Sequence, residues 1–247
     1  MKRRIVFATV LCAAAALVFA ADVTRPGATE SWFLYSVRGK PVGYLHATRS
    51  VSDMKLAPVL LEHEFAFDAR GKRLSLKMET WCADDECLSA VKIVSKGEGD
   101  DEFGTFTATV ERAGEGPVAG TLKVEEGDRA GFTLKIPERT VTDFALFEIV
   151  KTLPFDGDKP FDFNSLEASE LNLKRDRRLR YVGEEELTVA GKKTTLRKFE
   201  HTAAGGRVVT AFWLNDKHEI IRALIDDRKE FLLTTRDKAL AALEPEQ

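Results

Sequence analysis

Two apolar runs separated by a short polar turn constrain the possible folds of this chain most strongly. The runs occupy residues 207–214 and 219–225, and the polar residues 215–218 join them. β-Branched and aromatic residues favour strands, and Asn and Asp tolerate turn dihedrals, so the segment predicts a hairpin. Trp213 and its neighbours put large apolar side chains on both faces of the first strand. Such a strand is typical of the interior of a large sheet that is covered on both sides.

The same strand signature recurs along most of the chain. At residues 61–67 and again at 74–78, apolar side chains alternate with polar ones, which indicates strands with one buried and one wet face. Short stretches rich in Gly, Pro and charged residues separate such runs and predict turns between neighbouring strands. We therefore predict a mainly β protein over residues 30–235, in which one large antiparallel sheet curves into a half-barrel meander.

The spacing of apolar residues changes near the middle of the chain. Between residues 141 and 153 they recur at helical intervals, and Pro154 follows. The spacing predicts one mostly buried helix over about 141–153, lying across the open sheet. One sheet interrupted by this helix is a simpler interpretation than two subdomains divided at residues 137–165. A short C-terminal helix and tail are expected at residues 236–247.

The N-terminal segment has the features of an export signal. Three basic residues at positions 2–4 precede an apolar run, which ends near Ala20 in a small-residue cleavage pattern. The run is too short for a good membrane anchor, although an uncleaved anchor is the alternative. We expect residues 1–20 to be a signal peptide and residues 21–29 a flexible N-terminus. The mature protein would then be periplasmic or extracellular.

Charge and hydropathy narrow the partners that the mature chain can take. The formal net charge is −3, and loss of the three basic residues of the signal lowers it to −6. An acidic chain disfavours nucleic acid as a partner. No other apolar segment approaches the ~20 residues that a transmembrane helix needs. The expected partners are a lipid or other hydrophobic small molecule, or an envelope protein.

Two cysteines remain once Cys12 has left with the signal. Cys82 and Cys87 flank a short acidic turn. In an oxidising compartment this arrangement predicts a disulfide that clamps a hairpin. A metal or redox pair is the alternative, but their spacing differs from that of common zinc knuckles and thioredoxin-like motifs.

Motifs of known catalytic chemistry are missing from the sequence. It has no Gly-x-Ser-x-Gly elbow, no phosphate-binding glycine loop and no His-Glu-x-x-His helix. The histidines His46, His63, His201 and His218 are isolated, and we favour core or hydrogen-bonded imidazoles over metal ligands or general bases. We expect no catalytic residue, no cofactor and no metal site.

A basic run stands out against the acidic chain. It contains Arg175, Arg177, Arg178 and Arg180. Strand alternation puts Arg178 and Arg180 on one side and Arg175 and Arg177 on the other. The simpler interpretation is a solvated strand face balanced by nearby acidic residues. The alternative is a patch that binds anionic lipid head groups or an acidic partner.

Aromatic residues are more numerous than a sheet with one wet face requires. A curved sheet with an apolar concave face must fill the enclosed space with a helix or with a ligand, and one helix covers only part of it. We therefore predict a hydrophobic ligand site that includes Trp32, Tyr44, Phe65, Phe67 and Trp213.

Spaced residues along the chain also carry a resemblance. They are Trp32, Tyr35, Val37, Gly39 and Gly43 in one motif, then Leu153-Pro154-Phe155, the turn at 189–191, and Phe212-Trp213-Leu214 with Ile221-Arg222. Together they resemble a group of exported bacterial proteins of unknown function with a curved antiparallel half-barrel. This architecture is similar to that of periplasmic lipoprotein carriers, in which a half-barrel holds acyl chains under a helical lid. The resemblance implies no catalytic residue.

Three functional hypotheses follow. The first is a non-enzymatic envelope protein that binds a lipid or another hydrophobic molecule on the concave face of the sheet. The second is a structural or protein-interaction module whose concave face is already filled by the helix. The third is an exported hydrolase.

Overall fold

The computed structural model describes residues 28–243, except for 70–71, 84–87, 99–104, 113–118, 128–130, 132, 168–170 and 190. The predicted signal peptide, most of the predicted flexible N-terminus and Cys87 lie outside the described residues. Cys82 is fully buried at the end of its strand, and its Sγ lies 3.8 Å from the carbonyl oxygen of Thr80. The disulfide between Cys82 and Cys87 stays a prediction.

A single sheet of 15 strands makes up most of the described chain, together with two α-helices. The predicted mainly β class and the single curved sheet are confirmed. The strands are β1 (Thr29–Val37), β2 (Lys40–Val51), β3 (Val59–Ala69), β4 (Lys72–Cys82), β5 (Ala90–Glu98), β6 (Phe106–Arg112), β7 (Gly120–Gly127), β8 (Thr133–Ile136), β9 (Thr140–Thr142), β10 (Phe161–Glu167), β11 (Asn172–Val189), β12 (Lys192–Thr202), β13 (Val208–Leu214), β14 (Ile220–Ile225) and β15 (Lys229–Thr234).

The alternating sequence pattern determines which side chains the sheet buries. In β4, Leu74, Leu76 and Met78 are buried, whereas Lys77 between two of them is exposed. The hairpin of β3 and β4 sets Phe65 of β3 opposite Leu76. Since side chains alternate between the faces of a strand, this register puts apolar residues of both strands on the concave side.

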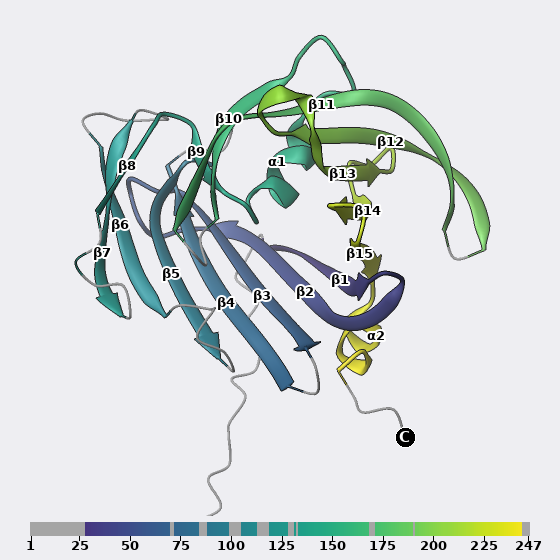
Figure 1. Ribbon diagram of the computed structural model, residues 1–247, viewed down its shortest axis with the longest axis horizontal. Helices are drawn as coiled ribbons and strands as arrows, with labels where there is room; N and C mark the ends of the chain where they lie inside the picture. Colours follow the sequence, from purple (N-terminus) through teal and green to yellow (C-terminus); the bar gives the residue numbers. More distant parts are fainter. Residues whose placement is uncertain are drawn as a thin grey trace, which may run out of the picture.

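The strand order explains how the sheet curves back on itself. Strands β1 and β15 pair near the centre of the sheet, whereas β8 and β9 lie at its two edges. Neighbours are antiparallel except for β9 and β10, which pair in parallel. Only residues 137–139 connect β8 to β9, and so short a link spans at most about 14 Å. The edges must therefore approach each other, and Figure 1 shows the sheet curving into a nearly closed barrel.

Side chains fill the gap between the two ends of the sheet. Leu166 of β10 and Leu171, which follows it, are buried in one cluster with Phe106 of β6 and Leu122 of β7. The edge strand β9 also contacts β5. The barrel-like shape is therefore held partly by apolar packing, since no ladder between the described residues joins the two edge strands.

Helix α1 (Leu146–Thr152) lies inside the curved sheet, as Figure 1 shows. The ring of Phe147 makes edge contacts with Phe33, Phe212 and Phe231, at centroid distances of 5.5 Å in each case. The helix begins later than the predicted residue 141, because residues 140–142 pair with β10 as strand β9. It is therefore a short plug rather than a long cover.

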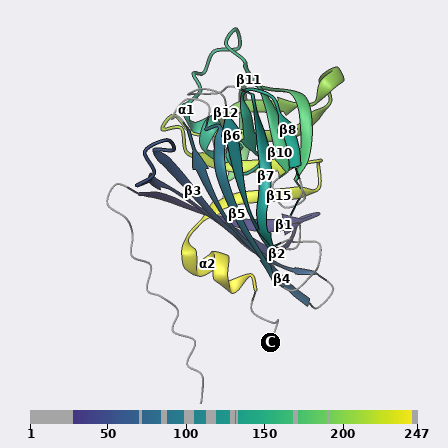
Figure 2. The ribbon, with the colours of Figure 1, turned by 90° about the vertical axis from the view of Figure 1, so that its left-hand side faces the viewer.

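Helix α2 (Arg236–Ala241) lies on the outside of the sheet against β1 and β2, as Figures 1 and 2 show. It covers a small apolar cluster of Trp32, Tyr44, Ala66 and Ala239. The predicted C-terminal helix is thus present and packs on the convex face. Within the described part of the chain, neither helix has the length and apolar character that a bilayer crossing requires.

Candidate functional site

The short helix α1 leaves an inner cavity of about 430 Å³ beside it. Aromatic side chains of the concave face line this cavity, with Phe144 and Phe147 on the helical side. Those from the sheet are Tyr35 of β1, Phe65 and Phe67 of β3, Phe212 of β13 and Phe231 of β15. Strands from both halves of the sheet therefore converge on one apolar space.

The aromatic rings that line the cavity pack closely against one another, and some of them leave part of their surface exposed toward it. The ring of Tyr35 lies 5.0 Å from Phe65 and 4.9 Å from Phe231, measured between centroids. Phe65, Phe67 and Phe144 nevertheless stay only half-buried. Apolar surface left exposed inside a concave face keeps the hydrophobic driving force for a ligand.

Charged residues line another part of the inner cavity. On the side of β10 and β11, the Lys174 ammonium lies 3.5 Å from the Glu167 carboxylate. Asp226 and Lys229, near the turn between β14 and β15, are exposed, and Asp143 precedes the helix. The cavity thus combines an apolar wall with a polar side.

Arg177 and His201 are the most unusual polar groups of the inner cavity. The Nε and Nη1 atoms of Arg177 and both ring nitrogens of His201 are buried and have no hydrogen-bond partner among the residues that the structure describes. Burial lowers the pKa of Arg177; Glu167 opposes this fall and Arg207 adds to it. Burial, helped by the charge of Arg177, lowers the pKa of His201 to about 4, so the imidazole is neutral at pH 7.

The arginines of the predicted basic patch do not lie together on one surface. Asp176 has a positive φ of 54°, and the pairing of β10 with β11 shifts register beside it. Arg175 and Arg180 are exposed and line neither of the two cavities described here, whereas Arg177 is half-buried and lines both. Because of this bulge, simple alternation does not describe the side on which Arg175 lies.

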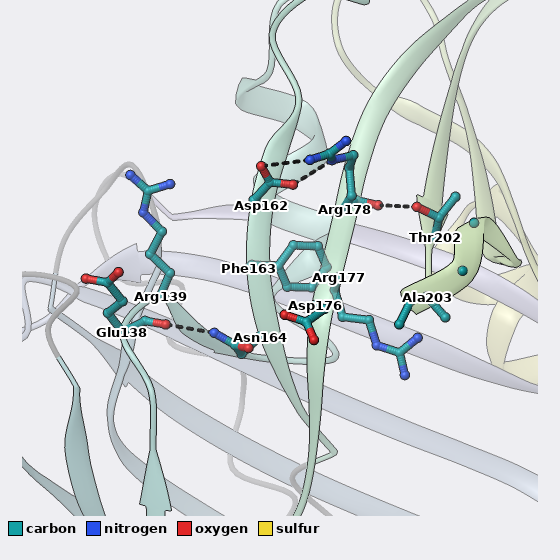
Figure 3. A pocket seen from close by; sticks show the side chains of 13 residues that line it. Glu138, Arg139, Asp162, Phe163, Asn164, Asp176, Arg177, Arg178, Thr202 and Ala203 are labelled. Atoms are coloured by element: carbon teal, nitrogen blue, oxygen red, sulfur yellow. Dashed lines mark hydrogen bonds and ion pairs between the residues drawn. The ribbon is translucent and has the colours of Figure 1, made fainter.

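A second, more polar cavity of about 530 Å³ lies along β10 and β11. Figure 3 shows Arg178 turned toward Asp162, to which its Nε donates at 2.6 Å, while Arg177 leaves the strand in another direction. Arg139 and Arg177 also line this groove. Since Arg178 already has a carboxylate partner on an exposed surface, it is a weaker candidate for binding a ligand than Arg177.

The five predicted ligand-binding aromatics lie in different places. Phe65 and Phe67 line the inner cavity. Trp32 and Tyr44 lie beneath α2 on the opposite face of the sheet. Trp213 belongs to another cluster with Leu196 and Ala211, and its Nε1 donates to Glu185 at 3.1 Å. The structure therefore brings two of the five to the inner cavity.

Other lining residues could not be recognised from their sequence positions. Tyr35 and Phe231 are cross-strand neighbours because β1 pairs with β15, strands from the two ends of the chain. His201 faces the cavity on β12, in register with Thr210 of β13, which also lines it. Alternation within each strand was the available signal, but it does not say which face is concave.

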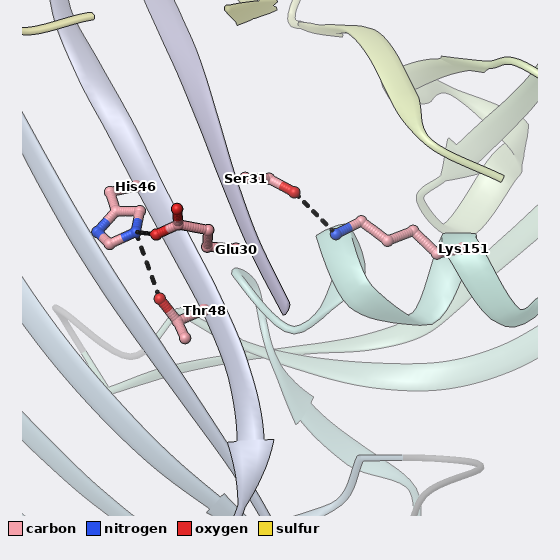
Figure 4. A network of polar contacts seen from close by, with 5 residues as sticks. All are labelled: Glu30, Ser31, His46, Thr48 and Lys151. Carbon is pink, nitrogen blue, oxygen red and sulfur yellow. Dashed lines mark hydrogen bonds and ion pairs between the residues drawn. The ribbon is translucent and has the colours of Figure 1, made fainter. Parts of the chain in front are cut away.

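Polar contacts also hold α1 against β1, and a separate set pairs residues on the outer face of β1 and β2 (Figure 4). The Lys151 ammonium donates to Glu148 at 2.6 Å within the helix and lies 3.4 Å from the hydroxyl of Ser31. On the other face, His46 lies 3.2 Å from Glu30 and stacks on Trp32 at a centroid distance of 3.9 Å. His46 therefore takes part in packing and surface pairing.

The candidate site is thus a partly apolar cavity within a mainly β, barrel-like sheet. In the described ranges, no group of three or more His, Cys, Asp or Glu side chains is arranged to hold a metal ion. Comparisons with protein-family models, curated proteins and solved structures found no match. The function must therefore be inferred from the chemistry of the cavity itself.

Proposed function

We propose that this protein is a non-enzymatic binding protein of the cell envelope, which takes up a lipid or another hydrophobic molecule in the inner cavity. The observation that carries the proposal is the half-buried state of Phe65, Phe67 and Phe144 inside the curved sheet. Export is supported by the signal-like N-terminal sequence. The resemblance to exported half-barrel proteins and lipoprotein carriers points to the same kind of ligand.

The shape of the interior favours a ligand site over a fully packed core. Native cores leave few voids larger than a water molecule. A cavity of about 430 Å³ lies within the ~300–1,000 Å³ range of small-molecule sites. The seven residues of α1 fill the region around Phe147 and leave the rest of the aromatic wall uncovered.

A neutral apolar dye tests this proposal directly. N-Phenyl-1-naphthylamine should gain fluorescence on binding the wild-type protein, and Phe67→Ser should weaken the binding about tenfold by removing one aromatic contact. Leu56→Ser is the control, because Leu56 is 66% exposed and lies away from the cavity. This variant should bind the dye as the wild type does.

Two results would contradict the proposal. One is that the wild type does not bind the dye at all, as expected of a filled core. The other is that Leu56→Ser and Phe67→Ser weaken binding equally, which would place the dye on general apolar surface. Native mass spectrometry of the protein purified from its producing cell should also show a bound lipid.

A further inference from the structure

Arg177 gives the inner cavity an electrostatic preference. Two of its N–H-bearing nitrogens are buried without a hydrogen-bond partner in the described ranges, although its guanidinium keeps its charge at any physiological pH. A buried donor without a partner destabilises the folded protein, and a charged one does so more strongly. A protein that keeps such a group in a cavity gains most from a ligand that supplies an anion there.

His201 lies close enough to Arg177 to feel its charge and faces the same space. It is 5% exposed and lines the inner cavity, and neither ring nitrogen has a hydrogen-bond partner within the part of the chain that the structure describes. A neutral imidazole still carries one N–H donor. An anion placed in the cavity beside Arg177 would therefore find a second buried donor that no protein group uses.

The carboxylates around the cavity do not take this role. Glu167 is paired with Lys174 at 3.5 Å, and Asp226 is exposed at the turn before β15. Asp143 lies on the helical side, and Lys229 adds a further cation. The buried Nε and Nη1 of Arg177 remain without a bond to any of these groups.

We propose that the ligand of the inner cavity is a single-chain amphiphile whose anionic group, a carboxylate or a phosphate monoester, binds Arg177 and His201. Its chain lies against Phe65, Phe67 and Phe144. The inference rests on the proposed function, since it specifies the ligand of the same cavity. A volume of about 430 Å³, near the lower end of the usual range, suits one chain rather than two.

The test compares ligands that share a chain and differ in charge. Binding of dodecanoate, dodecyl phosphate and dodecanol, below their micelle concentrations, would be measured by displacement of the apolar dye. The wild type should bind at least one anion roughly tenfold or more tighter than dodecanol. The tighter of the two anions identifies the head group as carboxylate or phosphate.

Arg177→Gln should abolish the preference for the anion while leaving dodecanol binding unchanged. Arg180→Gln is the matched control, because Arg180 lies on the same strand, is exposed and does not line the cavity. Arg180→Gln should keep the preference for the anion over dodecanol. Without ligand, Arg177→Gln should melt at the wild-type temperature or above, since it removes a charged group whose Nε and Nη1 are buried without a hydrogen-bond partner in the described part of the chain.

The outcomes separate this inference from the proposed function. If dodecanol binds as tightly as both anions, the cavity takes apolar ligands and the head-group inference is wrong. If Arg180→Gln loses the preference as much as Arg177→Gln, the effect is general surface charge and the inference is equally wrong. Failure of the dye and of every chain to bind would overturn the proposed function itself. A large fall in melting temperature for Arg177→Gln would assign the residue a structural role instead.

Discussion

Phe147→Ala should lower the free energy of unfolding by about 3–5 kcal/mol, the usual cost of removing a buried phenylalanine ring. Phe147 is 4% exposed and makes edge contacts with rings of β1, β13 and β15. Its loss would detach α1 from both halves of the sheet at once. Urea unfolding followed by circular dichroism would measure the change.

Phe144→Ala is the matched control for this variant. Phe144 lies three residues earlier but is only half-buried, because part of its ring faces the inner cavity. Phe144→Ala should therefore lower the free energy of unfolding clearly less than Phe147→Ala does. A loss below about 1 kcal/mol for Phe147→Ala would mean that α1 does not anchor the interior.

Acidification should destabilise the protein before its carboxylates titrate fully. Burial, with Lys151 and then His46 contributing, lowers the pKa of His63 to about 3, and the pKa of His201 is about 4. Between their ordinary value of 6.5 and these values, the unfolded chain binds protons that the folded protein does not. Stability therefore falls as the pH drops below 6.5, by about 2 kcal/mol for each ring at pH 5.

His63→Leu should remove about half of this dependence between pH 7 and pH 5. His63 is 3% exposed and stacks on Phe144 at 5.1 Å, so a leucine of similar size keeps most of the packing. Val110→Ala, a core change that removes no titratable group, should lower stability by a constant amount and keep the slope. Equal slopes in all three proteins, measured by thermal unfolding across pH, would show that His63 does not titrate as described.

Much of the fold could be predicted because strand periodicity is a local property. Leu74, Leu76 and Met78 alternate with polar residues, and their burial follows directly. The first residue of helix α1 was harder to predict. Residues 140–142 have apolar and β-branched character that suits a helix stripe or a strand, and only the long-range pairing with β10 decides between them.

The candidate site could be predicted only in part, since alternation separates the faces of a strand without saying which face is concave. Trp32 and Phe33 are neighbours on β1, yet Trp32 lies under α2 and Phe33 contacts α1. The packing of α2 on the convex side is a tertiary effect, and it determines what covers each face of β1. The side on which Arg175 lies likewise depends on the bulge at Asp176, a feature that no periodic pattern contains.

The pairing of β1 with β15 has a consequence for biosynthesis. The two halves of the sheet can form their own hairpins early, but they can join only after residues 229–234 have been synthesised. A chain stopped before Lys229 would expose two unsatisfied strand edges, one on β1 and one on β14. Such edges template aggregation, so premature termination of this protein should yield insoluble fragments rather than a partly working half.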